Sequence, residues 1–254
     1  MRKPSTYRFS EFVPLTSAEL QAVESLSIQQ LQLRRHDTIR SQGDAVHDIY
    51  LLSDGWVGCG MDVAAGTRQM VKVHLPGDLL GTPSMTLGYA AESLMALTRA
   101  TVEVIPVSAF AQLFMSSPRI AAASFLSSLK ERVFLMDRLT SVARTSAVQR
   151  LAAFLINVHH RLKVVGLEEQ QFHLPLSQHE LADVIGITPV HANRTWAQLE
   201  RTGLIRRQGK LVILLDVEGL KSLGAVPQRR FQRIPHWSIG LVEDMSPEAG
   251  TMVA

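Results

Sequence analysis

Residues 177–210 read SQHELADVIGITPVHANRTWAQLERTGLIRRQGK, and this stretch decides the fold of the C-terminal half of the chain. Ser177 is followed three residues later by a glutamate, a capping box that predicts a short helix ending at Gly186. Thr188 then suits the N-cap of a second helix, and Pro189 suits its first position. Two helices joined by so short a glycine turn indicate a helix-turn-helix unit.

The second helix of this unit has one apolar and one polar face. Ala192, Trp196 and Leu199 recur at helical spacing, so we expect this side to pack inward. On an exposed face, asparagine suits adenine, arginine suits guanine, and an apolar side chain suits the thymine methyl group. The residues expected to contact DNA in the two helices are Ser177, Gln178, Thr188, Pro189, Val190, His191, Asn193, Arg194 and Arg201.

A basic hairpin follows the second helix. Residues 201–210 hold four positive charges and no acid, and the aliphatic run Leu211–Leu215 comes next. This pattern predicts a wing whose Arg206, Arg207 and Lys210 neutralise phosphates, which supplies affinity without sequence choice. A single arginine of this kind is more often a solvated surface charge. The agreement of caps, turn, face and wing favours DNA binding over a helical bundle with chance charges.

The composition is that of a folded protein. The 254 residues are 46% hydrophobic and 19% charged, enough for two domains with cores of their own. No apolar run approaches the roughly 20 residues of a membrane span, and the basic N-terminus leads into no apolar signal segment. We therefore expect a cytoplasmic protein without a membrane partner. The net charge of +3 permits an anionic partner without requiring one.

The remaining pattern predicts an α+β chain with an N-terminal antiparallel β-roll, a long dimerisation helix and a C-terminal winged helix-turn-helix. Residues 16–26 begin with a capping box, and residues 28–110 alternate short aliphatic runs with turn signals. Residues 117–161 contain no glycine and a single proline at their start, which predicts helix, interrupted at 144–146. The expected division is 1–115 for the roll, 116–145 for the dimerisation helix, 146–223 for the winged helix-turn-helix and 224–254 for a flexible basic tail.

The long helix carries a coiled-coil pattern. A stripe with steps of four and three residues predicts a homodimer seam; its members are Ala122, Leu126, Leu129, Val133, Met136 and Thr140. A second stripe on the neighbouring face fits packing against the same chain; it consists of Phe125, Arg132, Leu135, Leu139 and Val142. The alternative is a helix buried on both sides within a monomer.

The chain resembles the superfamily of the cyclic-AMP receptor protein and the fumarate-nitrate reduction regulator, bacterial transcription factors, over residues 10–223. The residues that carry the resemblance are Gly43-Asp44, Ile49-Tyr50-Leu51-Leu52, Gly55, Leu75-Pro76-Gly77-Asp78-Leu79-Leu80-Gly81, Leu181-Ala182, Gly186-Ile187-Thr188, Asn193-Arg194, Leu199 and Gly203-Leu204-Ile205. The resemblance implies a two-fold dimer, half-sites about one helical turn apart, and a roll that receives a signal; the catabolite activator protein of this family is a standard example of such docking.

The resemblance also implies an effector pocket in the roll, made of Gly77, Asp78, Gly81, Thr82, Glu92 and Ser93. Cyclic-nucleotide binders of the family hold the ribose with a glutamate and the cyclic phosphate with an Arg-Ser/Thr pair, where this chain has Thr82 and Glu92-Ser93. A carboxylate beside a phosphate is repulsive, which argues against cyclic AMP in the usual mode. Val190 also stands where many members have a base-reading glutamate, so the half-site should differ from theirs.

The chain has a single cysteine, which limits the cofactors that it can bind. Cys59 alone excludes an internal disulfide, a cysteine-ligated iron–sulfur cluster and a four-cysteine zinc site. Cys59, His47, His74 or Met61 could still ligate haem. No pair of them has a spacing diagnostic of a haem site, so no cofactor is predicted. The alternative function is a cupin-like metal-binding roll with an accessory DNA-binding module, but the roll's histidines are scattered along the sequence.

The expected partners are double-stranded DNA and a second copy of the chain, with RNA polymerase added if the protein is an activator. The tail carries Arg229, Arg230 and Arg233, which suit a protein contact, a phosphate contact or plain solvation. The signal, the operator sequence and the direction of regulation stay open.

Overall fold

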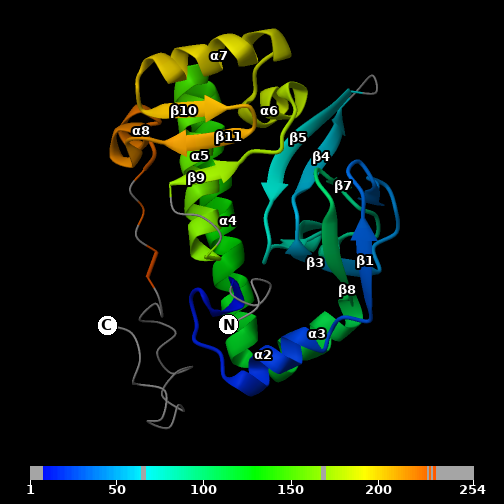
Figure 1. Cartoon of the computed structure of the whole chain (residues 1–254). Coiled ribbons are helices and arrows are strands. Elements are labelled where there is room, and N and C mark those ends of the chain that lie inside the picture. The colour runs from blue at the N-terminus through cyan, green and yellow to red at the C-terminus, as the bar shows by residue number, and fades with distance from the viewer. Residues whose placement is uncertain (1–7, 64–66, 167–169, 228, 230, 233–254) are drawn as a thin grey trace.

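A computed structural model describes residues 8–63, 67–166, 170–227, 229, 231 and 232. The roll lies beside one long helix, and the winged-helix unit lies at the upper end of that helix (Figure 1). In the described part of the chain, no helix is both long and apolar enough to cross a membrane.

The N-terminal segment covers the lower end of the roll. It contains the 3-10 helix η1 (Arg8–Ser10) and helix α2 (Ser17–Glu24). Thr16 caps α2 in the predicted capping box, accepting a hydrogen bond from the backbone N–H of Glu19. Phe9, Phe12 and Val13 are buried in an apolar cluster with residues of the roll and of the long helix, so this segment is part of the core.

The predicted antiparallel roll is confirmed. Its strands form two four-stranded sheets, ordered β1-β8-β3-β6 and β2-β7-β4-β5. The bounds are β1 (Gln29–Leu33), β2 (Thr38–Arg40), β3 (Asp48–Asp54), β4 (Val57–Val63), β5 (Thr67–His74), β6 (Leu79–Leu80), β7 (Ser93–Ala96) and β8 (Ala100–Pro106), with a 3-10 helix η3 (Thr82–Thr86) between β6 and β7. Leu52, Leu80 and Leu94 fill the space between the sheets and are fully buried.

Three helices follow the roll: α3 (Val107–Ser116), α4 (Pro118–Arg144) and α5 (Ala147–Val164). Ser117 caps α4 just ahead of the proline at its first position. Thr145 is extended and ends α4, and Ser146 caps α5 in a capping box with Gln149. The predicted helical stretch and its interruption are both confirmed.

The C-terminal unit is the predicted winged helix-turn-helix. It contains β9 (Gln171–His173), α6 (Gln178–Ile185), α7 (Pro189–Arg201), β10 (Ile205–Gln208), β11 (Leu211–Leu214) and α8 (Val217–Leu223). Its strands pair antiparallel in the order β10-β11-β9, so the wing is a hairpin anchored on a third strand. Gly186 ends α6 with a φ of 69°, the left-handed conformation that favours glycine at a helix C-terminus.

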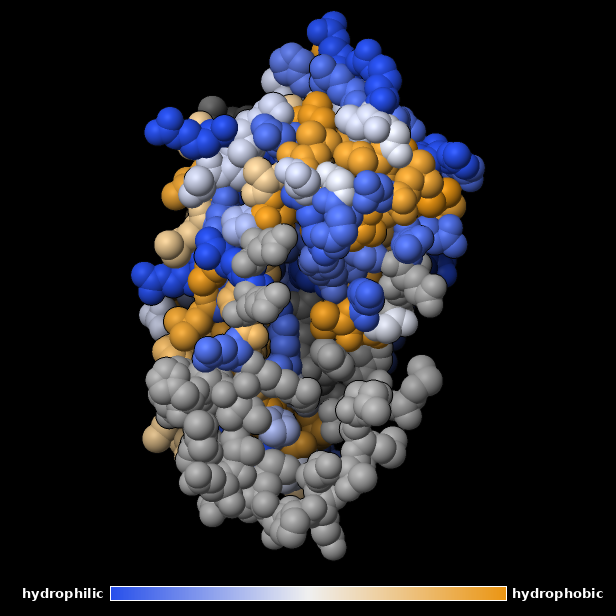
Figure 2. Space-filling model, turned by 90° about the vertical axis from the view of Figure 1, so that its left-hand side faces the viewer, coloured by the Kyte–Doolittle hydropathy of each residue, from blue (hydrophilic) through white to orange (hydrophobic). Residues whose placement is uncertain are grey.

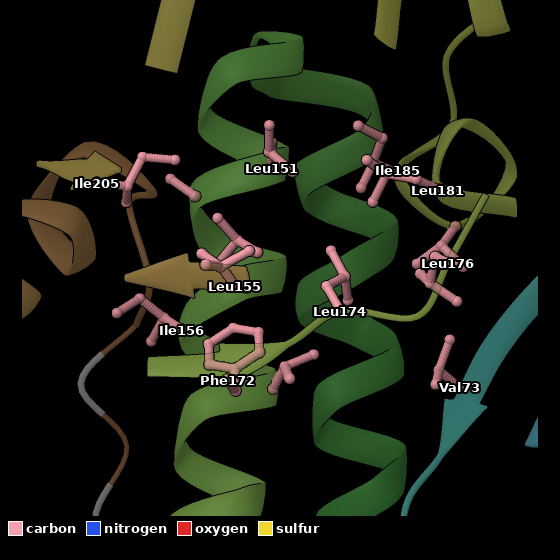
Figure 3. Packing of buried hydrophobic residues seen from close by; sticks show 14 of the residues in the cluster. Val73, Leu151, Leu155, Ile156, Phe172, Leu174, Leu176, Leu181, Ile185 and Ile205 are labelled. Atoms are coloured by element: carbon pink, nitrogen blue, oxygen red, sulfur yellow. The ribbon is translucent and has the colours of Figure 1, made fainter. Parts of the chain in front are cut away.

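The winged-helix unit shares its core with the roll. Leu151, Leu155 and Phe172 are fully buried in one apolar cluster. The roll contributes Val73 to the same cluster, and Figure 3 places this side chain beside those of the C-terminal unit. Other roll residues in the cluster are Met70, Leu75 and Leu97. The two units are therefore joined through continuous packing.

The face of α4 expected to pair with a second chain lies partly inside this one. Leu126 is 6% exposed and belongs to the N-terminal apolar cluster, with Ala122 packed against it. Leu129 (37% exposed) and Met136 (61%) of the expected seam are exposed. The stripe expected to pack against the same chain is exposed as well, which corrects that expectation; its apolar members are Phe125 (52%), Leu135 (56%), Leu139 (73%) and Val142 (48%). Leu126 and Ala122 are therefore removed from the predicted interface, because they pack in the core that Phe9 and Phe12 build. The rest of the seam stays a prediction.

Sequence reasoning missed contacts of the C-terminal segment. Arg229 donates two hydrogen bonds to the carboxylate of Asp137 on α4. The ring of Phe231 meets those of Phe12 and Phe134 edge-on, with centroids 6.2 and 5.8 Å away. Residues 229, 231 and 232 of the expected flexible tail are described, whereas Arg230 and Arg233 lie outside the described residues.

Candidate nucleic-acid interface

Helix α7 turns the face expected to read DNA toward solvent. Ala192, Thr195, Trp196 and Leu199 are buried beneath it. The opposite side exposes Val190, Asn193, Arg194 and Arg201, with Val190 72% exposed. Hydrophilic side chains crowd the end of the molecule where α7 lies (Figures 1 and 2). Because a solvent-facing valine has no packing role here, it is free to meet a thymine methyl group.

Polar side chains at the turn hold α6 and α7 in position. The side chain of Ser177 accepts a hydrogen bond from the backbone N–H of Glu180, as predicted for a cap. The amide of Gln178 donates to the carbonyl of Pro189 at 2.9 Å and so ties the N-termini of the two helices together. Thr188 stands at the N-cap of α7, but its hydroxyl lies 3.1 Å from His191 Nδ1 and makes no capping bond. The exposed side chains among these are those of Ser177, Gln178, Thr188 and His191.

The wing separates its basic residues onto two faces. Arg206 is exposed, and its side chain makes no hydrogen bond or ion pair with the residues that the structure describes. Arg207 lies on the opposite, inner face, with its guanidinium 4.8 Å from the ring centroid of Trp196. A strand alternates its side chains with a period of two, so Arg207 shares the side of buried Ile205. In the free protein Arg207 packs against Trp196, and its role as a phosphate contact stays a prediction.

The tip of the wing carries Lys210. This residue is exposed, and its ammonium group donates to the carbonyl of Pro175 at 3.3 Å. Arg201, at the end of α7, is exposed as well, and its Nε donates to the carbonyl of Ala197 within the same helix. Both cations are exposed, so both can reach a phosphate, and their contact with DNA stays a prediction.

An ion pair fixes α6 against the roll. Glu180 is 9% exposed, and both its carboxylate oxygens accept from Arg35 of the loop after β1, at 3.0 and 2.7 Å. One of these oxygens also accepts a hydrogen bond from the backbone N–H of Ser177. The same carboxylate therefore caps α6 and links this helix to the roll. Gln69 of β5 adds a bond to the carbonyl of Asp183. This pairing restrains the direction in which the unit presents α7.

A second charged contact joins the roll to α5. Asp78 is 3% exposed, and its carboxylate accepts hydrogen bonds from Arg161 and from the backbone N–H of Leu75. Arg161 also donates to the carbonyl of Val73. His74 Nδ1 lies 3.3 Å from the same carboxylate without the alignment of a hydrogen bond. Asp78, expected in the effector pocket, is therefore a contact between the roll and α5.

Within the roll, Glu92 is the centre of a buried polar cluster. Its carboxylate pairs with Arg40, and both side chains are at most 6% exposed. The hydroxyl of Ser84 donates to its other oxygen. Gly81, with a φ of 81°, lets its loop approach the Arg40 guanidinium, which would lie 2.7 Å from an added Cβ. Ser93 accepts from the backbone N–H of Gln42 instead, and Thr82 lies half-buried at the start of η3.

The haem and metal candidates are not gathered into a site. Burial raises the pKa of Cys59 to about 11, so its thiol is a poor ligand at neutral pH. His47 and Met61 are exposed, whereas His74 is buried beside Asp78. Within the described ranges, no three His, Cys, Asp or Glu side chains come close enough to hold a metal ion.

A roll, a long helix and a winged helix-turn-helix that exposes a polar helix face together define a DNA-binding transcription regulator. Residues 30–117 match the family model of the cyclic nucleotide-binding domain, and residues 149–223 match that of the Crp-like helix-turn-helix domain. The chain belongs to the Crp/Fnr superfamily of transcription regulators.

Several curated relatives span most of the chain. It is 26% identical over 211 residues to the transcriptional regulatory protein btr of Bordetella pertussis, covering 83% of this chain and 87% of that protein. It is 25% identical to the anaerobic regulatory protein of Haemophilus influenzae, covering 82% and 81% of the two chains. The transcriptional activator protein anr of Pseudomonas aeruginosa is 26% identical, with 80% and 83% covered.

Solved structures share the fold. FixK2 from Bradyrhizobium japonicum superposes with a TM-score of 0.70 at 21% identity, covering 78% of this chain and 98% of that one. A transcriptional regulator of the CRP/FNR family from Thermus thermophilus gives 0.61 at 20% identity, with 78% and 98% covered.

A cyclic nucleotide does not fit the residues that this roll presents. Glu92 occupies the position at which the resemblance expects a phosphate-binding arginine, and the guanidinium of Arg40 is already engaged by Glu92. A cyclic phosphate would bring a second negative charge beside a buried carboxylate. Asp78, which was also expected in the pocket, pairs with Arg161.

Proposed function

We propose that the chain acts as a homodimer that binds a pseudo-palindromic operator and regulates transcription in the cytoplasm, without catalysing a reaction. The observation that carries the proposal is the exposed face of α7, which presents Val190, Asn193 and Arg194 opposite the buried Trp196. In this geometry each copy reads one half-site, and the half-sites lie roughly 34 Å apart.

The second copy is expected on α4. The exposed Phe125, Leu129, Met136 and Leu139 form an apolar stripe with steps of four, seven and three residues, a spacing typical of a coiled-coil seam. An unpaired apolar stripe of this length is costly in water, and pairing two copies of it removes that cost. RNA polymerase is a further partner if the bound protein activates transcription.

Selection of bound duplexes from a random pool tests the proposal. We expect recovered sites to share an inverted repeat with half-site centres about 10 base pairs apart. Arg194→Ala should weaken binding to the selected site by about 1–3 kcal/mol, while binding to unrelated duplexes changes little. Recovery of duplexes with no shared sequence would contradict sequence-specific recognition. Sedimentation of the complex as one protein chain on a single half-site would contradict the dimer.

A further inference from the structure

The roll contains a buried cation that requires an anion. Arg40, at the end of β2, is 4% exposed and cannot lose its charge. Its guanidinium donates to the carbonyls of Asp48 and Gly81 at 3.1 and 3.4 Å, and these neutral acceptors leave the positive charge uncompensated. A buried charge without a counter-charge is strongly destabilising.

Glu92 supplies the missing negative charge from 52 residues further along the chain. One carboxylate oxygen accepts from Arg40 and the other accepts from the Ser84 hydroxyl, which itself accepts from the backbone N–H of Ala91 at 3.0 Å. An arginine guanidinium and a serine hydroxyl that donate to two carboxylate oxygens are groups with which proteins bind small oxyanions. Here the oxyanion is a side chain of the protein itself.

We propose that Glu92 is a built-in ligand of the roll: its carboxylate occupies an anion site formed by the Arg40 guanidinium and the Ser84 hydroxyl, so the native protein needs no external anionic effector. The site takes a small carboxylate such as acetate or formate when the Glu92 side chain is removed. This inference rests on the proposed function only where DNA binding is the readout. Arg40 Nε makes no hydrogen bond within the described part of the chain, so an added anion has a further donor to meet.

The first experiment measures thermal unfolding of Glu92→Ala in sodium acetate and in sodium chloride at equal ionic strength, without DNA. The variant should melt roughly 10 °C below the wild type, because a buried pair has lost one partner. Acetate should raise its midpoint saturably by several degrees more than chloride does, whereas the wild type should respond equally to both salts. The proposal would be overturned if acetate and chloride raised the midpoint of the variant equally. It would also be overturned if acetate raised the midpoint of the wild type saturably above its value in chloride.

A double variant keeps the test decisive if Glu92→Ala does not fold. Arg40→Met combined with Glu92→Leu removes the cation and its ligand together, so the demand for an anion disappears. We expect this protein to melt close to the wild type and to show no specific response to acetate. The role of Glu92 as a counter-ion would be refuted if the double variant melted no higher than Glu92→Ala. If Glu92→Ala does not fold, a double variant that also fails to fold would refute it.

The functional part is tested on the wild-type protein with a selected operator. Its DNA affinity should change less than twofold when cyclic AMP or inorganic phosphate is added at 1 mM, because the site is closed by Glu92. A tenfold rise in affinity with either anion would overturn effector independence. Failure to bind DNA under any condition would instead refute the proposed function and leave the melting experiment intact.

Discussion

We expect the titration of His74 to make the stability of this protein depend on pH. The residue is the last of β5 and is 5% exposed. Burial and the nearby Lys72 lower its pKa from 6.5 to about 4, and the partly opposing attraction of Asp78 and Glu131 does not restore it. The folded protein therefore keeps this imidazole neutral where the unfolded chain would protonate it.

The sign and size follow from proton linkage. A histidine whose folded-state pKa is depressed contributes its full stability above pH 6.5 and loses it as the pH falls toward 4. With these two values, about 2 kcal/mol of unfolding free energy is lost at pH 5, and about 3 kcal/mol is lost below pH 4. His74→Gln cannot take up this proton, so its stability should fall less steeply over the same range.

Urea unfolding at several pH values between 8 and 4.5 measures the difference. Val73→Ala is the matched control, because it removes buried carbon from the preceding position of β5 and leaves the titrating group in place. This variant should be less stable at every pH and should keep the slope of the wild type. If His74→Gln loses as much stability between pH 7 and pH 5 as the wild type, His74 is not the group responsible.

Four further variants test the surfaces described above. Arg206→Ala should weaken binding to all duplexes alike and reduce the slope of affinity against salt by about 1, as a salt titration would show. Arg207→Ala should leave that slope unchanged and lower the unfolding free energy by about 1 kcal/mol, because it removes the contact with Trp196; an altered slope would restore its role at phosphate. Met136→Glu should produce monomers in sedimentation at concentrations where the wild type is dimeric, since it places two carboxylates in the seam; an unchanged dimer would exclude this face. Phe231→Ala should lower the unfolding free energy by about 1–2 kcal/mol, because two edge-on ring contacts are lost, and urea unfolding that matches the wild type would show that this contact does not form in solution.

The parts of the fold that depend on neighbours in the sequence could be predicted from it. The caps at Ser177 and Thr16, the turn at Gly186 and the buried side of α7 all follow from spacings of three or four residues. The same reasoning placed Val190 and Arg194 outward. The inward position of Arg207 could also have been found, because it shares the two-residue period of Ile205.

The errors arise from contacts between residues far apart in the sequence. Leu126 was assigned to the dimer seam because periodicity alone does not show which of two adjacent faces the N-terminal segment covers. Asp78 was placed in a ligand pocket by resemblance, whereas Arg161, 83 residues later, engages its carboxylate. The partner of Glu92 was equally hidden, because no local pattern connects it with Arg40. Sequence reasoning found the charge that repels phosphate but not the cation that neutralises it.

The apolar cluster shared by the roll and the winged-helix unit limits how the DNA-reading helix can be re-aimed. Met70, Val73, Leu75 and Leu97 of the roll would be exposed to water if the unit swung away as a rigid body. Small sliding movements that exchange one packed arrangement for another avoid most of this exposure. Changes in the aim of α7 should therefore be concerted shifts of α5, α6 and the strand β5 beneath them, rather than rotation about a loose joint.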